Sequence, residues 1–369
     1  MTEKRGICFL SSNGVGLGHL TRQLAIAQRM SSHWRPLFVT MSYAAGLASK
    51  SGYPTLFIPH HYALGTESED WNPQLELELE LLARHVPLTA LIYDATAVYG
   101  GVIETMARHR EIYSVWMRRP MWREMHRGFL ALSDRFDAII EPGELADELD
   151  EGPTKEFQHQ VHRVPPVLML APGERLERAQ ARRDLALPDD AIVVALQLGS
   201  GTNFDMEPVR KAAIATLLRN PEVVVLDLRS PGRSTGGDEI PSSPRHRRIA
   251  MFPAFRHSRA FDAAVCAPGY NTFHENILGG IPTLFVPNEA DEMDQQLSRA
   301  RWAEGLGMAL LLRCADHLTG IETSIKQLLD RTEQHAMAER CKRIEWTNGA
   351  SAIVRFIEDH ASSAPRRTV

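Results

Sequence analysis

A single histidine, His19, stands where a proton acceptor could act. It follows a glycine-rich turn at residues 11–18, which comes after an apolar run at residues 7–10 and before an amphipathic stretch at residues 19–30. This order predicts a strand, a turn and a helix. The positive end of the helix dipole disfavours an imidazolium, so His19 should be neutral near pH 7 and able to accept a proton. A histidine in this place could also do no more than satisfy the helix end.

Asp94 is a natural partner for this histidine. It closes the apolar run at residues 90–93, and the carboxyl ends of parallel strands share one edge of a sheet. A carboxylate bonded to Nδ1 of His19 would hold the tautomer and stabilise the imidazolium as it forms. Alternatively, Asp94 is the N-cap of the next helix. Arg22 lies one turn after His19 and shares its face, unless it is a solvent-exposed helix arginine.

A second pattern, at residues 263–296, predicts a parallel strand–helix–strand unit. An apolar run at residues 263–266 leads through a Pro-Gly turn into a helix announced by Thr272, which Gly279-Gly280 ends before another apolar run. The helix would begin where the first strand ends, so its free N–H groups and positive dipole end would face the carboxyl edge of the sheet. This geometry suits a phosphate.

Two polar groups flank this unit. Glu275 lies one turn into the helix, where a ribose could sit, and Asp294-Gln295-Gln296 follows the second strand. Each has a simpler interpretation. Thr272 and Glu275 can form a capping box, the glycines can be helix C-caps, and the polar triplet can be a solvated helix entry. In this order and spacing, the combination favours a binding site over the separate interpretations.

The composition is that of an ordinary globular chain. The length of 369 residues is sufficient for two domains, and 44% of the residues are hydrophobic and 24% are charged. A net charge of −5 gives no reason to expect nucleic acid as a partner. The four scattered cysteines form no C-x-x-C pair and predict neither a disulfide framework nor a structural zinc site. No apolar run is long enough for a signal peptide or a membrane span, which indicates a cytoplasmic protein.

Strand-like and helix-like segments alternate along the chain, which predicts parallel sheets with helices on both faces. We expect an N-terminal domain at residues 1–165, a linker at residues 166–190 and a C-terminal domain at residues 191–345. The C-terminal helix, within residues 346–369, is expected to pack back on the N-terminal domain and to end in a disordered tail.

Three segments allow more than one assignment. Residues 75–82 alternate Leu and Glu as an exposed strand would, but both residue types favour helices, so we expect a helix. Residues 116–123 mix Trp, Met and Arg. We expect a strand end followed by a partly buried amphipathic helix there, although a membrane surface or an acceptor pocket suits the same residues. Residues 230–248 are rich in Gly, Pro, Ser and Arg and predict an exposed loop.

Residues 266–296 resemble the donor-binding segment of GT-B nucleotide-sugar glycosyltransferases, most of all the branch of the peptidoglycan N-acetylglucosaminyltransferase and the antibiotic glycosyltransferases. A glycine turn followed by a histidine, as at His19, is typical of the acceptor domain of that family. The resemblance implies an α/β GT-B fold, in which two Rossmann-like, doubly wound parallel-sheet domains face an interdomain cleft. The chain departs from the family pattern at Tyr270-Asn271, where small residues are usual.

By motif position, the resemblance assigns three groups of residues. The catalytic pair is His19 as general base and Asp94 as its helper. The acceptor or phosphate side comprises Gly16, Gly18 and Arg22. The donor-binding set comprises Gly199, Ser200, Gly201, Thr202, Asn203, Met251, Phe252, Gly269, Tyr270, Asn271, Thr272, Glu275, Asp294, Gln295 and Gln296.

The resemblance implies an inverting transferase that needs no cofactor. His19 would deprotonate an acceptor hydroxyl, which would attack the anomeric carbon of a UDP or dTDP sugar opposite the leaving diphosphate. The partners would be small molecules, a nucleotide sugar and a hydroxyl acceptor, and peripheral membrane contact is compatible with a lipid-linked acceptor. No Asp-x-Asp motif follows an apolar strand, so we expect no catalytic metal. Two alternatives stay open, a nucleotide-sugar hydrolase on the same fold and a catalytically silent sugar-nucleotide-binding protein.

Overall fold

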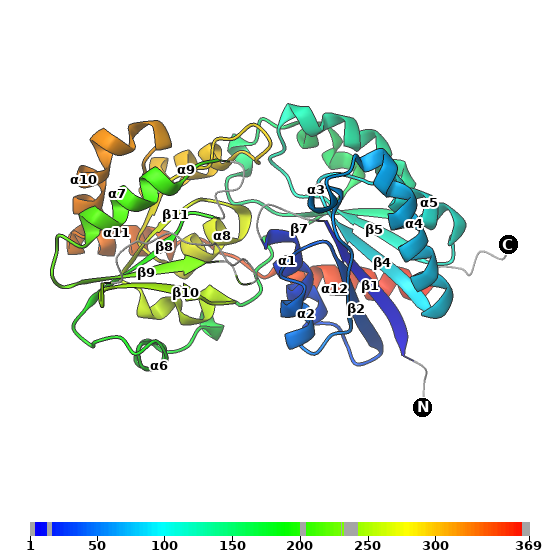
Figure 1. Cartoon of the computed structure of the whole chain (residues 1–369), viewed down its shortest axis with the longest axis horizontal. Helices are drawn as coiled ribbons and strands as arrows, with labels where there is room; N and C mark the ends of the chain where they lie inside the picture. The colour runs from blue at the N-terminus through cyan, green and yellow to red at the C-terminus, as the bar shows by residue number, and fades with distance from the viewer. Residues whose placement is uncertain (1–3, 13–16, 200–203, 230, 232–242, 364–369) are drawn as a thin grey trace. The chain divides into compact units, whose positions relative to one another are not determined.

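The computed structural model (Figure 1) describes residues 4–12, 17–199, 204–229, 231 and 243–363. The chain divides into two compact units. Unit 1 comprises Met1–Glu144, Glu151–Met169 and Asn348–Val369, and unit 2 comprises Leu145–Asp150 and Leu170–Thr347. The residues predicted as a linker, 166–190, are divided between the two units. Residues 145–150 join unit 2 although no signal in the sequence sets them apart from their neighbours.

Unit 1 is built on one parallel sheet of seven strands, in the order β3-β2-β1-β4-β5-β6-β7. The strands are β1 (Arg5–Ser11), β2 (Trp34–Thr40), β3 (Thr55–Phe57), β4 (Leu88–Asp94), β5 (Tyr113–Met117), β6 (Ala138–Pro142) and β7 (His162–Val164). The helices are α1 (Gly18–Ala27), α2 (Gly46–Lys50), α3 (His61–Leu64), α4 (Ser68–His85), α5 (Gly100–Arg108) and α12 (Gly349–Ser363), with 3-10 helices η1 (Glu124–Arg135) and η3 (Pro153–Gln160). Helices α1, α2 and α12 lie on one face of the sheet, and α4 and α5 lie on the other (Figure 1).

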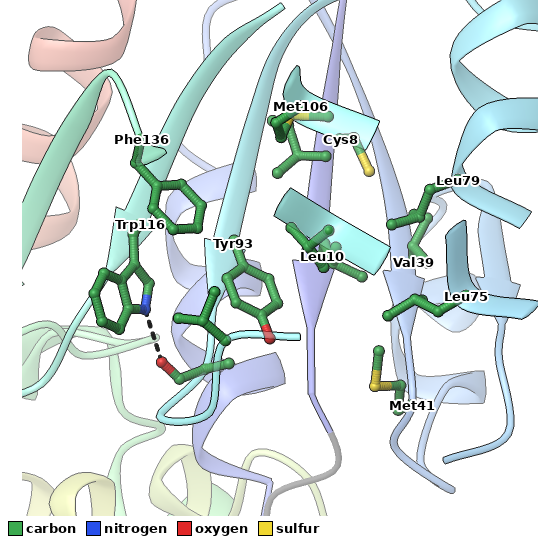
Figure 2. Close-up of a cluster of buried hydrophobic side chains, with 14 of the residues drawn as sticks. Cys8, Leu10, Val39, Met41, Leu75, Leu79, Tyr93, Met106, Trp116 and Phe136 are labelled. Carbon is green, nitrogen blue, oxygen red and sulfur yellow. Dashed lines mark hydrogen bonds between the residues drawn. The ribbon is translucent and has the colours of Figure 1, made fainter. Parts of the chain in front are cut away.

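One core cluster of unit 1 lies between the sheet and helices α4 and α5. Leu75 and Leu79 are one helical turn apart and both are buried, which places the apolar face of α4 on the sheet. The indole N–H of Trp116 donates to the backbone oxygen of Ala95 at 2.9 Å, so this large ring is buried with its polar atom satisfied. Figure 2 shows ten labelled members of this core, Cys8, Leu10, Val39, Met41, Leu75, Leu79, Tyr93, Met106, Trp116 and Phe136.

Unit 2 carries a second parallel sheet, with six strands in the order β10-β9-β8-β11-β12-β13. The strands are β8 (Ile192–Gln197), β9 (Val223–Arg229), β10 (His246–Ala250), β11 (Ala263–Cys266), β12 (Thr283–Phe285) and β13 (Leu310–Leu311). The helices are α6 (Arg178–Asp184), α7 (Glu207–Leu217), α8 (Tyr270–Gly279), α9 (Gln296–Gly305), α10 (His317–Leu328) and α11 (Arg331–Cys341), with 3-10 helices η2 (Asp147–Leu149), η4 (Pro172–Glu174), η5 (Ala254–Ala260) and η6 (Cys314–Asp316). Apolar side chains of β8, β9, β11 and β12 pack against α7 and α10 to form one core cluster of this unit. Two parallel-sheet domains confirm the predicted α/β class.

The three ambiguous segments have different outcomes. Residues 75–82 are helical, as their residue types predicted, because α4 spans them. In residues 116–123 the strand end is confirmed, but no helix begins before Glu124, and the rings of Trp116 and Trp122 are buried rather than offered to a surface.

The prediction that residues 230–248 form a loop is wrong at its end. Residues 246–248 belong to β10, which pairs in parallel with β9 at the edge of the sheet. Half-buried Arg247 and Ile249 alternate with exposed Arg248 and Ala250 along β10, so its polar and charged side chains are compatible with a strand that is partly covered on one face. Residues 364–369, which include most of the tail that we expected to be disordered, lie outside the described residues.

Gly349, the first residue of α12, lies directly against the backbone of unit 1. A Cβ atom at this position would lie 1.9 Å from the carbonyl oxygen of Pro165. We therefore expect Gly349→Ala to push α12 away from the sheet and to lower the free energy of unfolding by about 3 kcal/mol. Differential scanning calorimetry would register this as a lower melting temperature.

The matched control is Gly46→Ala in α2 of the same unit. No atom lies within 4 Å of the added methyl group, and alanine favours a helix over glycine, so the melting temperature should stay constant or rise slightly. Equal melting temperatures for the two variants would contradict the steric argument.

Candidate active site

His19 and Asp94 lie together because their strands are neighbours in the sheet of unit 1. Strands β1 and β4 pair in parallel, and Ser11 at the end of β1 lies opposite Asp94 at the end of β4. Helix α1 starts at Gly18, shortly after β1 ends, so His19 is held in its first turn at the carboxyl edge of the sheet. The parallel pairing of β1 and β4 therefore places His19 and Asp94 next to each other, as predicted.

The carboxylate of Asp94 is bonded by both His19 and Arg22. Nδ1 of His19 lies 2.7 Å from Oδ1 of Asp94. Arg22 donates from Nε to Oδ2 at 2.9 Å and from Nη2 to Oδ1 at 2.5 Å. The side chains of Asp94 and Arg22 are wholly buried, whereas that of His19 is 12% exposed. The predicted alternatives are thus wrong for two residues, since Arg22 is not on the surface and α5 takes Tyr99 as its N-cap.

This arrangement decides the tautomer of His19. Nη2 of Arg22 also lies 3.2 Å from Nδ1 of His19, but an arginine can only donate. An ionised Asp94 can only accept, so Nδ1 must carry a proton and both donors share Oδ1. The lone pair of the neutral imidazole then stands on Nε2, the atom available to take a proton.

Electrostatics favour a neutral histidine beside an ionised aspartate. Burial lowers the pKa of His19, the cations of Arg22 and Arg119 lower it further, and Asp94 opposes them without outweighing them. Burial alone would raise the pKa of Asp94, but the Arg22 guanidinium and the His19 ring outweigh it and hold that pKa below its ordinary value. Near pH 7, the pair is therefore poised to accept one proton at Nε2.

The phosphate-binding geometry predicted in unit 2 begins at the ends of β8 and β11. These strands pair in parallel, with Gln197 opposite Cys266. Gly269 is the N-cap of α8 and has no side chain with which to cap the helix. Gly280 follows α8 as a left-handed C-cap with φ of +63°, as one simpler interpretation predicted.

The prediction that Thr272 announces this helix is wrong. Helix α8 begins at Tyr270, because the backbone N–H of Gly269 closes a tight turn onto the oxygen of Ala267 at 2.9 Å. Tyr270, Asn271 and Thr272 therefore form the first turn of the helix, and the capping box of Thr272 with Glu275 is not formed.

Glu275 is a half-buried carboxyl on α8. Within the described ranges no protein group donates a hydrogen bond to it, and burial raises the pKa of Glu275 to about 8. A carboxyl with this environment is stabilised as a carboxylate only when a ligand supplies donors.

The polar triplet after β12 is folded into unit 2 rather than solvated. Asp294 pairs with Nη1 of the fully buried Arg299 at 2.6 Å. The same Nη1 donates to the backbone oxygen of Pro268 at 3.3 Å, in the turn that precedes α8. Oε1 of Gln296 accepts from the backbone N–H of Asn288 at 3.0 Å, and its Nε2 lies 4.0 Å from where a Cβ on Gly269 would stand. The simpler interpretation as a solvated helix entry is therefore wrong, and this part of the predicted donor set lies in one place.

Other members of the predicted set are placed less completely. Gly16 and residues 200–203 (Ser200, Gly201, Thr202 and Asn203) lie outside the described residues. Gly199, at the start of that turn, has a left-handed φ of +77°. Met251 and Phe252 follow β10 and are half-buried, and Phe255 in the same connection would lie 2.8 Å from a Cβ on Gly279 of α8.

The sequence analysis did not identify two arginines that donate hydrogen bonds to backbone oxygens near the predicted donor site, Arg210 to Gly199 and Arg299 to Pro268. Arg210 on α7 forms a buried ion pair with Asp227 on β9 and donates to the backbone oxygen of Gly199 at 3.3 Å. A signal existed for Asp227, because it is the only charged residue in the apolar run at residues 223–228. Arg299 carries no comparable signal, since nothing in its own neighbourhood predicts burial.

The described residues contain no group of three or more His, Cys, Asp or Glu side chains arranged to hold a metal ion. Among the described helices, none is long and apolar enough to cross a membrane. Burial raises the pKa of Cys8, Cys266 and Cys341 to about 12, so these thiols stay protonated.

Comparison with known proteins points to one group of enzymes. No protein-family model matches the chain. It is 28% identical over 180 residues to the UDP-N-acetylglucosamine–N-acetylmuramyl-(pentapeptide) pyrophosphoryl-undecaprenol N-acetylglucosamine transferase of Salinibacter ruber, covering 48% of this chain and 49% of that protein. It is 27% identical over 189 residues to the Rhodococcus opacus enzyme of the same name, covering 50% and 49%. The chain thus spans about half the length of the curated relatives it matches.

Solved structures establish the fold. The glycotransferase of kitacinnamycin superposes with a TM-score of 0.66 at 15% identity, over 97% of this chain and 99% of that one. MurG of Acinetobacter baumannii superposes with a TM-score of 0.60 at 13% identity, over 96% and 100%. The predicted GT-B fold, with its two parallel-sheet α/β domains, is therefore confirmed.

The electrostatic balance at His19 can be tested by Asp94→Asn. Asp94 raises the pKa of His19 by its charge and its hydrogen bond, so its loss should lower that pKa further. We expect the wild-type imidazole to titrate below the usual 6.5, and that of Asp94→Asn to titrate lower still, in a ¹H–¹⁵N NMR pH titration.

Asp137→Asn is the control for losing one negative charge in the same unit. The carboxylate of Asp137 accepts from the backbone N–H of Ser114 at 2.8 Å. Asp137 precedes β6, so it lies where the strands begin, whereas His19 lies where they end. The titration of His19 should be the same in this variant as in the wild type. A His19 pKa that rises in Asp94→Asn would refute the assignment.

Proposed function

We propose that the chain is a glycosyltransferase that moves a sugar from a nucleoside diphosphate sugar, of the UDP or dTDP type, to an acceptor hydroxyl. The observation that carries this proposal is the match of half the chain to UDP-N-acetylglucosamine transferases. The GT-B fold and the His19–Asp94 pair are consistent with it.

The acceptor hydroxyl is activated by His19. Its Nε2 takes the hydroxyl proton as the oxygen attacks the anomeric carbon, from the face opposite the diphosphate, and configuration inverts. Asp94 stabilises the resulting imidazolium through the 2.7 Å contact to Nδ1 and keeps the ring in the correct tautomer. Arg22 keeps Asp94 ionised, so it acts on the reaction only through Asp94.

The donor is held by unit 2. Negative charge grows on the diphosphate as the bond to the sugar breaks, and the N–H groups at the start of α8 stabilise it. The carboxylate of Glu275 accepts the ribose hydroxyls, while Gln295 and Gln296 contact the sugar. We propose further that no catalytic metal takes part, because these dipoles meet the leaving charge directly.

His19→Ala should separate chemistry from donor binding. We expect kcat to fall by a factor of about 10²–10⁴, because a positioned general base supplies acceleration of this size. The Kd for UDP, measured by calorimetry, should change less than about twofold, since the donor site is built from unit 2. His33→Ala, at an exposed histidine of the same unit, should match the wild type in both quantities.

The same assay decides between the alternatives. Release of nucleoside diphosphate only when an acceptor extract is present, unchanged by EDTA, supports the metal-free transferase. Release without any acceptor would make the protein a nucleotide-sugar hydrolase. Donor binding without turnover under every condition, with no effect of His19→Ala, would make it a binding protein.

The affinity for UDP should depend on the ionisation of Glu275. Ribose hydroxyls donate to a carboxylate, so below its pKa of about 8 the group must first lose a proton, and binding weakens as the pH falls. We expect the association constant for UDP to rise roughly fivefold to tenfold between pH 7 and pH 8.5. Glu275→Gln should bind more weakly and lose this dependence.

Glu304→Gln, which changes an exposed glutamate on α9, should keep the wild-type pH profile. A flat profile in the wild type, measured by titration calorimetry in several buffers, would remove Glu275 from the site.

A further inference from the structure

A cluster of aromatic rings in unit 1 lies at the same edge of the sheet as His19 and Asp94. Tyr99 is the N-cap residue of α5 and follows β4, which ends at Asp94. His60 is the N-cap residue of α3 and follows β3. Nε2 of His60 lies 2.7 Å from the hydroxyl oxygen of Tyr99, and the ring of Trp71 contacts both of their rings. The connections that follow β3 and β4 are thereby fastened together at the carboxyl edge of the sheet.

The hydrogen bonds of His60 decide its tautomer. Burial, together with the charge of His61, lowers the pKa of His60 to about 4, so this ring is neutral near pH 7. Its Nδ1 accepts from the backbone N–H of Tyr62 at 3.3 Å, which leaves the single ring proton on Nε2. Nε2 of His60 therefore donates to the hydroxyl oxygen of Tyr99.

The hydroxyl of Tyr99 keeps a proton of its own to donate. Its oxygen accepts from His60, so its O–H must be directed to another group. Within the part of the chain that the structure describes, no group accepts a hydrogen bond from it. Burial and the neighbouring Tyr62 raise the pKa of Tyr99, so the hydroxyl stays protonated. The side chain is half-buried, which leaves part of it open to a ligand.

The surface around this hydroxyl is apolar. Among the described residues, ten large apolar side chains are exposed, and five of these lie in residues 43–64: Tyr43, Leu56, Phe57, Tyr62 and Leu64. Tyr62 is 79% exposed, and the centroid of its ring lies 4.9 Å from that of His60. Such a concentration of exposed apolar side chains is typical of a binding surface. A saccharide fits it poorly, because many of the sugar hydroxyls would face apolar side chains and lose their hydrogen bonds to water.

We propose that Tyr62 and Tyr99 bind an acceptor that carries an aromatic ring and a carbonyl oxygen. The aromatic ring packs on Tyr62, and the carbonyl oxygen accepts a hydrogen bond from Tyr99. His60 is a positioning residue, because its N–H sets the direction of the Tyr99 hydroxyl. The proposal rests on the proposed function, since it names the class of acceptor that binds at the sheet edge where His19 lies.

Two ligands that differ in one group test the hydrogen bond from Tyr99. 4-Hydroxyacetophenone carries a carbonyl group on its ring, and 4-ethylphenol has a similar size without that group. The measured quantity is the Kd for 4-ethylphenol divided by the Kd for 4-hydroxyacetophenone, from ligand-observed NMR titrations of the full chain. We expect Tyr99→Phe to lower this ratio about tenfold, because one hydrogen bond contributes a factor of this size.

Two variants of His60 separate its hydrogen bond from its packing. His60→Gln keeps an N–H group long enough to donate to Tyr99. His60→Asn keeps an oxygen that can cap α3 but is too short to reach the hydroxyl. We expect the ratio to fall about fivefold in His60→Asn and to stay within about twofold of the wild type in His60→Gln.

Tyr113→Phe is the matched control, since Tyr113 is another half-buried tyrosine of unit 1 but lies at the start of β5, at the opposite end of the strands. Its ratio should equal that of the wild type. An unchanged ratio in Tyr99→Phe, or a wild-type chain that binds UDP but neither phenol, would overturn the inference and leave the proposed function standing. A wild-type chain that binds neither UDP nor the phenols would overturn both.

Discussion

The carboxylate of Asp94 is the charge on which the arrangement of unit 1 depends. An ion removed from water costs several kcal/mol unless its oxygens are bonded, and Asp94 is wholly buried. Arg22 meets this requirement with two hydrogen bonds and His19 with a third. Because both partners come from the first turns of α1, the same bonds hold that helix at the carboxyl edge of the sheet and hold the imidazole in one tautomer.

Buried arginine–carboxylate pairs also occur in unit 2, where each arginine additionally bonds a backbone oxygen. Arg210 joins Asp227 to the backbone oxygen of Gly199, and Arg299 joins Asp294 to the backbone oxygen of Pro268. In each case a guanidinium bonds a side-chain anion and a turn carbonyl together, which its several fixed donors allow. The turns that border the proposed diphosphate site are thereby held without side chains of their own.

Much of the fold could be predicted from local sequence, and the reasons are physical. Buried parallel strands read as apolar runs, and the residue that follows each run lies at the sheet edge, which is how Asp94 could be paired with His19 from 75 positions away. The edge strands β7 and β10 escaped this reasoning. Strand β10 carries two adjacent arginines, Arg247 and Arg248, and therefore resembles a loop. The start of α8 was placed too late because threonine is a strong capping residue, whereas the glycine that caps the helix has no side chain.

The bond between Asp150 and Gln295 and the packing of the last helix depend on contacts between residues far apart in the sequence, which local sequence patterns do not reveal. Asp150 and Gln295 are 145 positions apart, and neither has neighbours that predict their bond. Helix α12 likewise joins unit 1 after the whole of unit 2 has been traversed, packing on α1 and β4, with the backbone of Ser31 bonded to Glu358 at 3.2 Å. On the ribosome, the sheet of unit 1 emerges before unit 2 but lacks the cover of α12 until unit 2 has been synthesised. Unit 2 can fold first, so the half that is synthesised first should be the one that matures last.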